Sequence, residues 1–305
     1  MYLYWYKIKD GINNFGDQLN PYIVGKLNGC EVDYLPIADA PVRRILKCIK
    51  GLFHHQYSFH DLAVLISSLK EKHYYVAIGS VIEWIRGKNC HVWGAGLIKR
   101  NGLIKECQFH AVRGKITEQR IKELGYTSPF AIGDPAILLP LIYKPRTKKR
   151  YETGIIPHYI HYQEIKKQIG QLNNQLLLIN LQDDTEKIID QIYSCKKIIT
   201  SSLHGLITAH SYQIPALWVR LSEQPLAGDN VKFSDYFSSV EIKTYPPFTI
   251  HLKDKISEEI INNLFLVNKK LFEPQINLSR LQKNLLKAAP FEILEKYKKF
   301  INHEG

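Results

Sequence analysis

Short apolar runs alternate with helical patterns along most of the chain, and this alternation limits the possible folds more than any other feature. The apolar runs predict strands over 3–8, 74–79, 90–96, 129–133, 153–158, 175–180, 196–201 and 215–219. The segments 17–27, 115–124, 184–195 and 204–212 have the spacing of helices. Such alternation predicts an α/β fold with mostly parallel sheets, and near-continuous apolar strands predict burial on both faces.

A break in the pattern falls at 143–153, where Pro145 and a dense basic run replace the apolar period. This composition is typical of a linker. We therefore expect an N-terminal α/β domain over 1–145, a second over 146–256 and a helical tail over 257–305. Pro290 suits the first turn of the last helix. Ligands of parallel sheets bind beyond the carboxyl ends of the strands, so the informative residues should follow strands.

The composition narrows the partners. The 305 residues carry a formal charge of +12, which favours anionic ligands. No zinc finger, RNP-like aromatic pattern or basic heptad region accompanies this charge, so we expect no nucleic-acid partner. The five cysteines include no C-x-x-C pair, which argues against a disulfide framework and a structural zinc site. We expect no metal ion and no bound cofactor.

The sequence predicts a cytoplasmic protein. It contains no run of about 18 apolar residues that would cross a membrane, and its N-terminus lacks the pattern of a signal peptide. The segment 41–53 could still touch a membrane surface, because apolar and basic residues separate onto two helix faces. The apolar ones are Val42, Ile45, Leu46, Ile49, Leu52 and Phe53, and the basic ones Arg43, Arg44, Lys47 and Lys50. This pattern fits a helix lying on an anionic membrane, or a core helix with a solvated basic face.

Candidate ligand-binding residues follow the predicted strands of the first half. Asn14, Gly16 and Asp17 open a helix after the first strand, where backbone N–H groups attract anions; the plainer interpretation is a turn with a helix cap. Further glycines and a serine follow the next strands, where either a ligand or a packed helix can approach closely. These residues are Gly79, Ser80, Gly94 and Gly96.

Two charged residues of the first half stand at strand–helix junctions. The planar fork of Arg113 could bind a carboxylate or a phosphate, or form a surface salt bridge. Asp134 precedes Pro135, so it is a candidate for ligand binding or for capping a helix.

The stretch "ITSSLHGLITAH" is the strongest candidate site. Ser201 and Ser202 end a strand and can cap the next helix or bind a phosphate, with Gly205 in its first turn. His204 lies in that turn, and histidine is the natural proton donor near neutral pH. His158, at the end of another strand, is a second candidate in catalysis or a structural residue. No G-x-S-x-G, Walker A or G-x-G-x-x-G motif occurs.

Together these stretches resemble the polysaccharide pyruvyl transferase family. The matching segments, in family order, are "NFGDQLNPYIV", "AIGSVI", "VWGAG", "VRGKITEQRIKELG", "IGDPAILLP", "IIPHY", "ITSSLHGLITAHSYQIPAL" and "KFSDYFSSV". The resemblance implies a GT-B-like fold of two Rossmann-like domains facing across a cleft, with the acceptor on the N-terminal side and the donor on the C-terminal side. Members often have an arginine inside the serine–histidine motif; here Leu203 follows Ser202 directly.

The resemblance implies transfer of the pyruvyl group of phosphoenolpyruvate to a sugar of a surface polysaccharide or its lipid-linked precursor, as a ketal. We expect Arg113, Ser201 and Ser202 to hold the donor, His204 to act as the acid, and Asp17 or His158 to accept the sugar proton. Phosphoenolpyruvate would be a co-substrate. The alternatives are a glycosyltransferase that uses a nucleotide sugar on the same fold, and a binding protein whose site has decayed.

Overall fold

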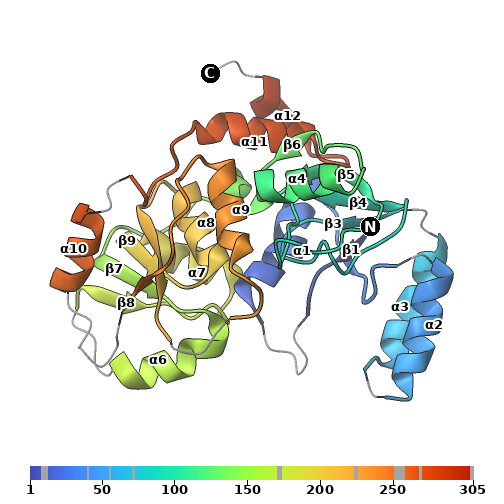
Figure 1. Cartoon of the computed structure of the whole chain (residues 1–305), viewed down its shortest axis with the longest axis horizontal. Coiled ribbons are helices and arrows are strands. Elements are labelled where there is room, and N and C mark those ends of the chain that lie inside the picture. The colour runs from blue at the N-terminus through green and yellow to red at the C-terminus, as the bar shows by residue number, and fades with distance from the viewer. Residues whose placement is uncertain are drawn as a thin grey trace.

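Two parallel β-sheets form the framework of the protein in a computed structural model (Figure 1). The structure describes residues 1–7, 13–39, 41–54, 56–70, 73–169, 174–222, 226–250, 258–267 and 270–302. The first sheet has the order β2-β1-β3-β4-β5-β6 and the second β11-β10-β9-β7-β8, with parallel neighbours throughout. The predicted α/β class with parallel sheets is confirmed.

The first sheet is built from the N-terminal half of the chain. Its strands are β1 (Tyr2–Tyr4), β2 (Asp33–Tyr34), β3 (Tyr74–Val76), β4 (Cys90–Trp93), β5 (Gln108–Val112) and β6 (Ala131–Ile132). The helices between and after them are α1 (Phe15–Asn28), α2 (Pro41–Leu52), α3 (Phe59–Ser67), α4 (Lys115–Glu123) and α5 (Leu139–Ile142), with short 3-10 turns at Ser68–Lys70 and Pro135–Leu138.

The second sheet follows in the chain. Its strands are β7 (Tyr151–Ile156), β8 (Leu176–Leu178), β9 (Cys195–Thr200), β10 (Ala216–Arg220) and β11 (Phe248–Thr249). Its helices are α6 (Tyr162–Ile169), α7 (Thr185–Tyr193), α8 (Leu203–Ser211) and α9 (Val231–Ser239), with a 3-10 turn at Tyr159–His161. The C-terminal helices are α10 (Glu258–Val267), α11 (Leu278–Lys287) and α12 (Glu295–Asn302).

The structure corrects several predicted boundaries. All eight predicted strands overlap observed ones, but most are shorter: the run predicted over 3–8 ends as a strand at Tyr4, and its residue 8 lies outside the described residues. The predicted linker over 143–153 runs into β7, which begins at Tyr151. Pro290 is not in the first turn of the last helix, because α12 begins at Glu295. The predicted start of the helical tail, residue 257, lies outside the described residues.

Helix α1 joins the two halves of the molecule. It follows β1 of the first sheet, yet the amide of Phe15 donates to the carbonyl of Leu181, and the helix packs against α7 and α8 of the second half. One hydrophobic core therefore includes Leu19 and Ile23 of α1 together with Leu206 of α8. This continuous burial fixes the relative positions of the loops that leave the two sheets.

The C-terminal helices return to the first half. The indole N–H of Trp93 on β4 donates to the carbonyl of Leu285 on α11 over 2.9 Å, and the amide of Leu294 donates to the carbonyl of Leu27 at the end of α1. In Figure 1 the orange-red α11 lies beside the green β6, and the red α12 packs on α11. These contacts tie the last described elements of the chain to the first sheet.

Candidate active site

A pocket of about 320 Å³ lies where loops from both sheets meet. Seven of the predicted residues line it, namely Asn14, Asp17, Gly79, Ser80, His158, Ser202 and His204. Three aromatic residues line it as well, Tyr6, Trp84 and Tyr159, together with Lys232 of α9. The expectation that informative residues follow strands thus leads to one place in the structure.

The structure has two other cavities of note. One of about 210 Å³ adjoins the pocket and includes Ser201, His161 and Arg220 in its lining. The other, about 730 Å³, lies between α8 and α11 and contains none of the predicted residues. Within the described parts of the chain, no group of three or more histidine, cysteine or acidic residues has an arrangement that could hold a metal ion.

His204 is placed by contacts from both halves. Ser202 caps α8, its hydroxyl accepting from the amide of Gly205, so His204 lies in the first turn as predicted. The imidazole rests on Gly16 of α1: a Cβ added there would come 2.1 Å from Nδ1. Its other nitrogen, Nε2, is 3.5 Å from Oδ2 of Asp134. The ring therefore requires a glycine at position 16 and faces a carboxylate on its buried side.

Asp134 lies behind His204 and does not line the pocket. Its Oδ1 accepts from the amide of Ala136 and so caps the 3-10 turn, as one of the sequence interpretations proposed. Its Oδ2 is buried and has no hydrogen-bond donor in the described part of the protein. The His204 ring faces that oxygen. Nε2 of His204 likewise has no hydrogen-bond partner among the described residues, so the two groups face each other at ion-pair distance without a hydrogen bond.

Asp17 is the acidic group of the pocket. It lies in the first turn of α1 and accepts from the Asn14 amide over 2.6 Å. Burial raises its pKa to about 6, while the hydrogen bond from Asn14 and the charge of His204 act in the opposite direction. A carboxyl group with this pKa exchanges protons near neutral pH, as a general base must.

His158 is held near the pocket by its backbone. Its amide donates to the hydroxyl of Ser201 over 2.9 Å. Burial, together with the charges of the nearby Lys232, His161 and His204, lowers its pKa to about 3. Its Nδ1 is buried without a hydrogen-bond partner among the described residues. The ring is therefore neutral at physiological pH and suited to hydrogen bonding, while Asp17 is the stronger base of the two.

Lys232, which the sequence interpretation did not single out, supplies the cation of the pocket. Burial lowers its pKa to about 8, with a further contribution from the charge of Arg113. Among the described residues its ammonium has no carboxylate partner; it lies 5.6 Å from the ring centroid of Phe233. An unpaired, partly buried ammonium favours an anionic ligand. The signal in the sequence was the motif "KFSDYFSSV", where it is the first residue.

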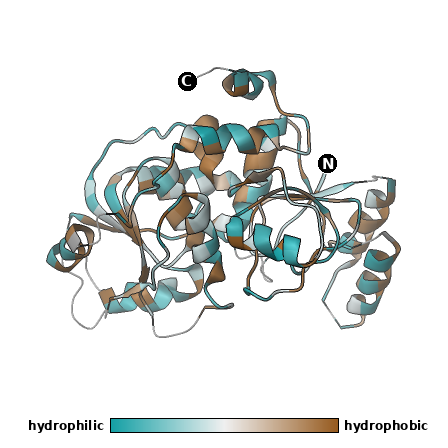
Figure 2. Ribbon diagram, turned by 45° about the horizontal axis from the view of Figure 1, so that its top comes forward, coloured by the Kyte–Doolittle hydropathy of each residue, from teal (hydrophilic) through white to brown (hydrophobic). Residues whose placement is uncertain are grey.

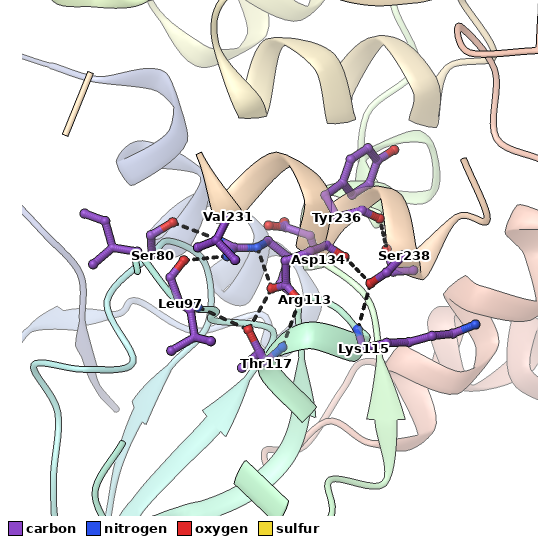
Figure 3. Close-up of polar contacts among 12 residues, drawn as sticks. Ser80, Leu97, Arg113, Lys115, Thr117, Asp134, Val231, Tyr236 and Ser238 are labelled. Atoms are coloured by element: carbon purple, nitrogen blue, oxygen red, sulfur yellow. Dashed lines mark hydrogen bonds and ion pairs between the residues drawn. The ribbon is translucent and has the colours of Figure 1, made fainter. Parts of the chain in front are cut away.

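Arg113 does not reach the pocket. Figure 3 shows its guanidinium enclosed by three acceptors: Nε donates to Asp235, one terminal nitrogen to the hydroxyl of Ser80 over 2.8 Å, and the other to the carbonyl of Leu97. The side chain is fully buried, so Arg113 has neither of its two predicted roles: it forms no surface salt bridge and does not contact a ligand in the pocket. Its link to the pocket is Ser80, which it orients from behind.

Four other predicted residues serve packing or lie in the adjoining cavity. Gly96 faces the guanidinium of Arg113, where a Cβ would come 2.5 Å from its central carbon, and a Cβ at Gly94 would come 2.1 Å from Pro135. Gly205 packs on Thr200 and Ile156. Ser201 lines the adjoining cavity. Close packing, the plainer interpretation, accounts for Gly94 and Gly96.

Comparison with known proteins agrees with these motifs. The family model of polysaccharide pyruvyl transferases matches residues 14–223, more than half of the chain. A relative from Acanthamoeba polyphaga mimivirus, "Uncharacterized protein L143", is 38% identical over 180 residues, which are 56% of this chain and 62% of that protein. The chain thus spans less than two thirds of the curated relative it matches. On the family match and on the pocket that its motifs line, the chain belongs to the polysaccharide pyruvyl transferase family.

Proposed function

We propose that the protein transfers the pyruvyl group of phosphoenolpyruvate to a sugar, forming a pyruvate ketal. The observation that carries the proposal is the unpaired Lys232, which shares one pocket with Asp17 and the His204–Asp134 pair. The acceptor would be a sugar of a cell-surface polysaccharide or of its lipid-linked precursor, and the reaction would take place in the cytoplasm. Phosphoenolpyruvate is the co-substrate, with no further cofactor.

In the proposed donor site Lys232 supplies the positive charge, since no arginine stands between Ser202 and His204. Phosphoenolpyruvate is a small, multiply charged anion, and Lys232 lies where one of its anionic groups would be neutralised. The hydroxyls of Ser80 and Ser202 and the neutral ring of His158 line the same pocket and can hydrogen-bond its oxygens. Arg113 acts only through Ser80 in this proposal.

The chemistry balances with these groups. His204 donates a proton to the methylene carbon, which forms a C–H bond and leaves positive charge at the carbon bearing the phosphate. A sugar hydroxyl attacks that carbon and gives its proton to Asp17. The bond from that carbon to the phosphate oxygen breaks, and phosphate leaves. A second hydroxyl closes the ketal, and its proton leaves with the phosphate. In this proposal Asp134 is the carboxylate next to the His204 ring, with Oδ2 3.5 Å from Nε2.

We further propose that the architecture is of the GT-B type. The first domain, 1–145, would present the acceptor, and the aromatic rings of Tyr6 and Trp84 offer surfaces on which a sugar can stack. The second domain, 146–256, would hold the donor through α8 and α9. The tail, 257–305, contains α11 and α12, which pack back on the first sheet and so bridge the two domains.

The direct test is phosphate release from phosphoenolpyruvate in the presence of nitrophenyl or lipid-linked sugars. The expected result is acceptor-dependent release that His204→Ala lowers by roughly 10²- to 10⁴-fold. A thermal-shift screen separates the glycosyltransferase alternative, since a ligand of the native state raises the melting temperature. Stabilisation by UDP- or CMP-sugars without stabilisation by phosphoenolpyruvate would overturn the proposal.

A further inference from the structure

The hairpin of α2 and α3 projects from the side of the first sheet (Figure 1) and exposes an apolar stripe. Val42, Leu46 and Ile49 recur every three or four residues on α2, so they share one helix face, and Phe53 follows directly after the helix. Three of them are 71%, 61% and 80% exposed, namely Val42, Leu46 and Phe53. Figure 2 shows hydrophobic and hydrophilic residues along both helices of this hairpin.

Buried polar contacts hold α2 with this stripe outward. Arg44 is almost fully buried and lies over the ring of Tyr74 on β3, and Cys48, one turn later, is buried as well. The buried carboxylate of Asp39 pairs with Lys47 over 2.6 Å and with Arg86 over 3.2 Å. The interpretation of 41–53 as a core helix with a solvated basic face is therefore wrong: one arginine faces the core, and the apolar stripe faces outward.

A basic stripe runs beside the apolar one. Arg43, Lys47 and Lys50 occupy the adjoining face of α2 and are exposed. Over residues 41–70 the sequence has five lysines and arginines but a single acidic residue, Asp61. The second helix adds exposed apolar side chains, Phe59 and Ile66, and Leu69 follows in the 3-10 turn. The hairpin thus combines apolar surface with positive charge.

We infer that the α2–α3 hairpin binds the surface of an anionic lipid bilayer. Apolar side chains beside lysine and arginine suit the boundary between acyl chains and acidic headgroups. The core of a protein–protein interface is instead depleted of charged residues, and lysine in particular is rare there. None of the described helices is long and apolar enough to cross a membrane, so the contact is with its surface.

Docking would bring the bilayer near the pocket. The hairpin is joined to the strand that leads to Tyr6 by the hydrogen bond between Tyr2 and Ser67, of 2.9 Å. Asp39, just before α2, binds Arg86, two residues after the pocket residue Trp84. A lipid-linked sugar could then enter the pocket while its lipid stays in the membrane. This consequence, unlike the docking itself, rests on the proposed function.

Cosedimentation with lipid vesicles tests the docking without any substrate. The wild-type protein should bind vesicles of mixed phosphatidylglycerol and phosphatidylcholine, and should bind vesicles of pure phosphatidylcholine far more weakly. It should dissociate from the anionic vesicles as the salt concentration rises. The pairs Leu46→Glu/Phe53→Glu and Arg43→Gln/Lys50→Gln should each lose roughly tenfold or more of the binding. Matched pairs on other surfaces, Leu103→Glu/Phe130→Glu and Lys166→Gln/Lys167→Gln, should bind like the wild type.

Three results would overturn the inference: no binding of the wild type to the anionic vesicles, equal binding to neutral ones, or equal loss in the matched pairs. Sedimentation velocity covers self-association. The stripe would instead be a subunit interface if the wild type formed a dimer, the Leu46→Glu/Phe53→Glu variant were a monomer, and the wild type did not bind vesicles. Unchanged melting temperatures show that the variants fold. Phosphate release with a soluble sugar is measured separately, so failure of the docking and failure of the proposed function are distinguishable.

Discussion

Nε2 of His204, in the first turn of α8, lies 3.5 Å from Oδ2 of Asp134, which follows β6 of the other sheet. The two residues are 70 positions apart in the sequence and belong to different halves of the molecule. The pair exists only while α1 and the 3-10 turn at Pro135–Leu138 pack against α8. The packing of the two halves thus brings His204, the acid of the proposed reaction, next to Asp134.

Asp134→Asn should lower kcat roughly 10- to 100-fold while the protein remains folded, because the amide keeps an oxygen for the cap on Ala136 but removes the charge behind His204. Steady-state rates check this, with the melting temperature as control. A variant with the wild-type rate would exclude Asp134 from the reaction.

Gly16→Ala should abolish most of the activity. The added Cβ would come 2.1 Å from Nδ1 of His204, so the ring would have to leave its observed position. We expect a loss approaching that of His204→Ala, measured as phosphate release. Gly25→Ala, in the same helix, is the matched control, because its Cβ would only touch the carbonyl of Cys30 at 3.3 Å. If both variants kept wild-type rates, the ring would not need its observed position.

Lys232→Met should weaken phosphoenolpyruvate binding roughly 10- to 100-fold, since a hydrogen bond to a charged group contributes about 1.5–3 kcal/mol. For the wild type, affinity should fall as pH rises through about 8, where Lys232 loses its charge in the free protein. Calorimetry at pH 7 and pH 9 measures both effects. Lys115→Met, which alters an exposed lysine at the start of α4, serves as control. Equal affinity in the two variants would remove Lys232 from the donor site.

The sequence predicted eight of the described strands and missed β2, β5 and β11. β2 and β11 have two residues each, and β5 mixes Gln108 and His110 with apolar residues on a half-exposed face. No apolar run marks such strands. The starts of α8 and of the 3-10 turn at Pro135–Leu138 were predictable from local signals, because Ser202 and Asp134 cap them through amides only two or three positions away.

The roles of the two cations were not predictable in the same way. Arg113 stands at a strand–helix junction, which made it the expected ligand of the donor. Its partner Asp235 lies 122 residues away on α9, and no local pattern reports that contact. The carboxylate of Asp235 engages Arg113 and Thr117, and Lys232, three residues earlier, is left facing the pocket. Only the docking of α9 on α4 decides which cation is free.

The ion pair of Arg113 and Asp235 should therefore contribute to stability and not to donor affinity. Asp235→Asn leaves a buried guanidinium without its counter-charge, and we expect the free energy of unfolding to fall by about 3 kcal/mol. Arg113→Lys should also destabilise, and the double variant should lose less than the sum of the two. Urea denaturation measures these values. A variant that loses phosphoenolpyruvate affinity at unchanged stability would return Arg113 to the donor site.

Asp17→Asn should lower activity yet stabilise the fold at alkaline pH. As the proposed base, Asp17 should give the wild type an acid limb near pH 6 in the rate–pH profile, and the variant should lose that limb together with roughly 10²-fold in rate.

The pKa of Asp17 rises from an ordinary 3.8 to about 6 on folding, so its stabilising contribution is complete below about pH 4 and lost above pH 6. This corresponds to at most about 3 kcal/mol, less for a side chain that lines an open pocket. We expect the variant to gain about 1–2 kcal/mol at pH 8 and little at pH 4. Urea denaturation at the two pH values measures the difference. Asp183→Asn serves as control, because Asp183 is a half-exposed carboxylate paired with Lys187. Equal gains at both pH values would show that the ionised carboxylate carries no cost in the folded protein.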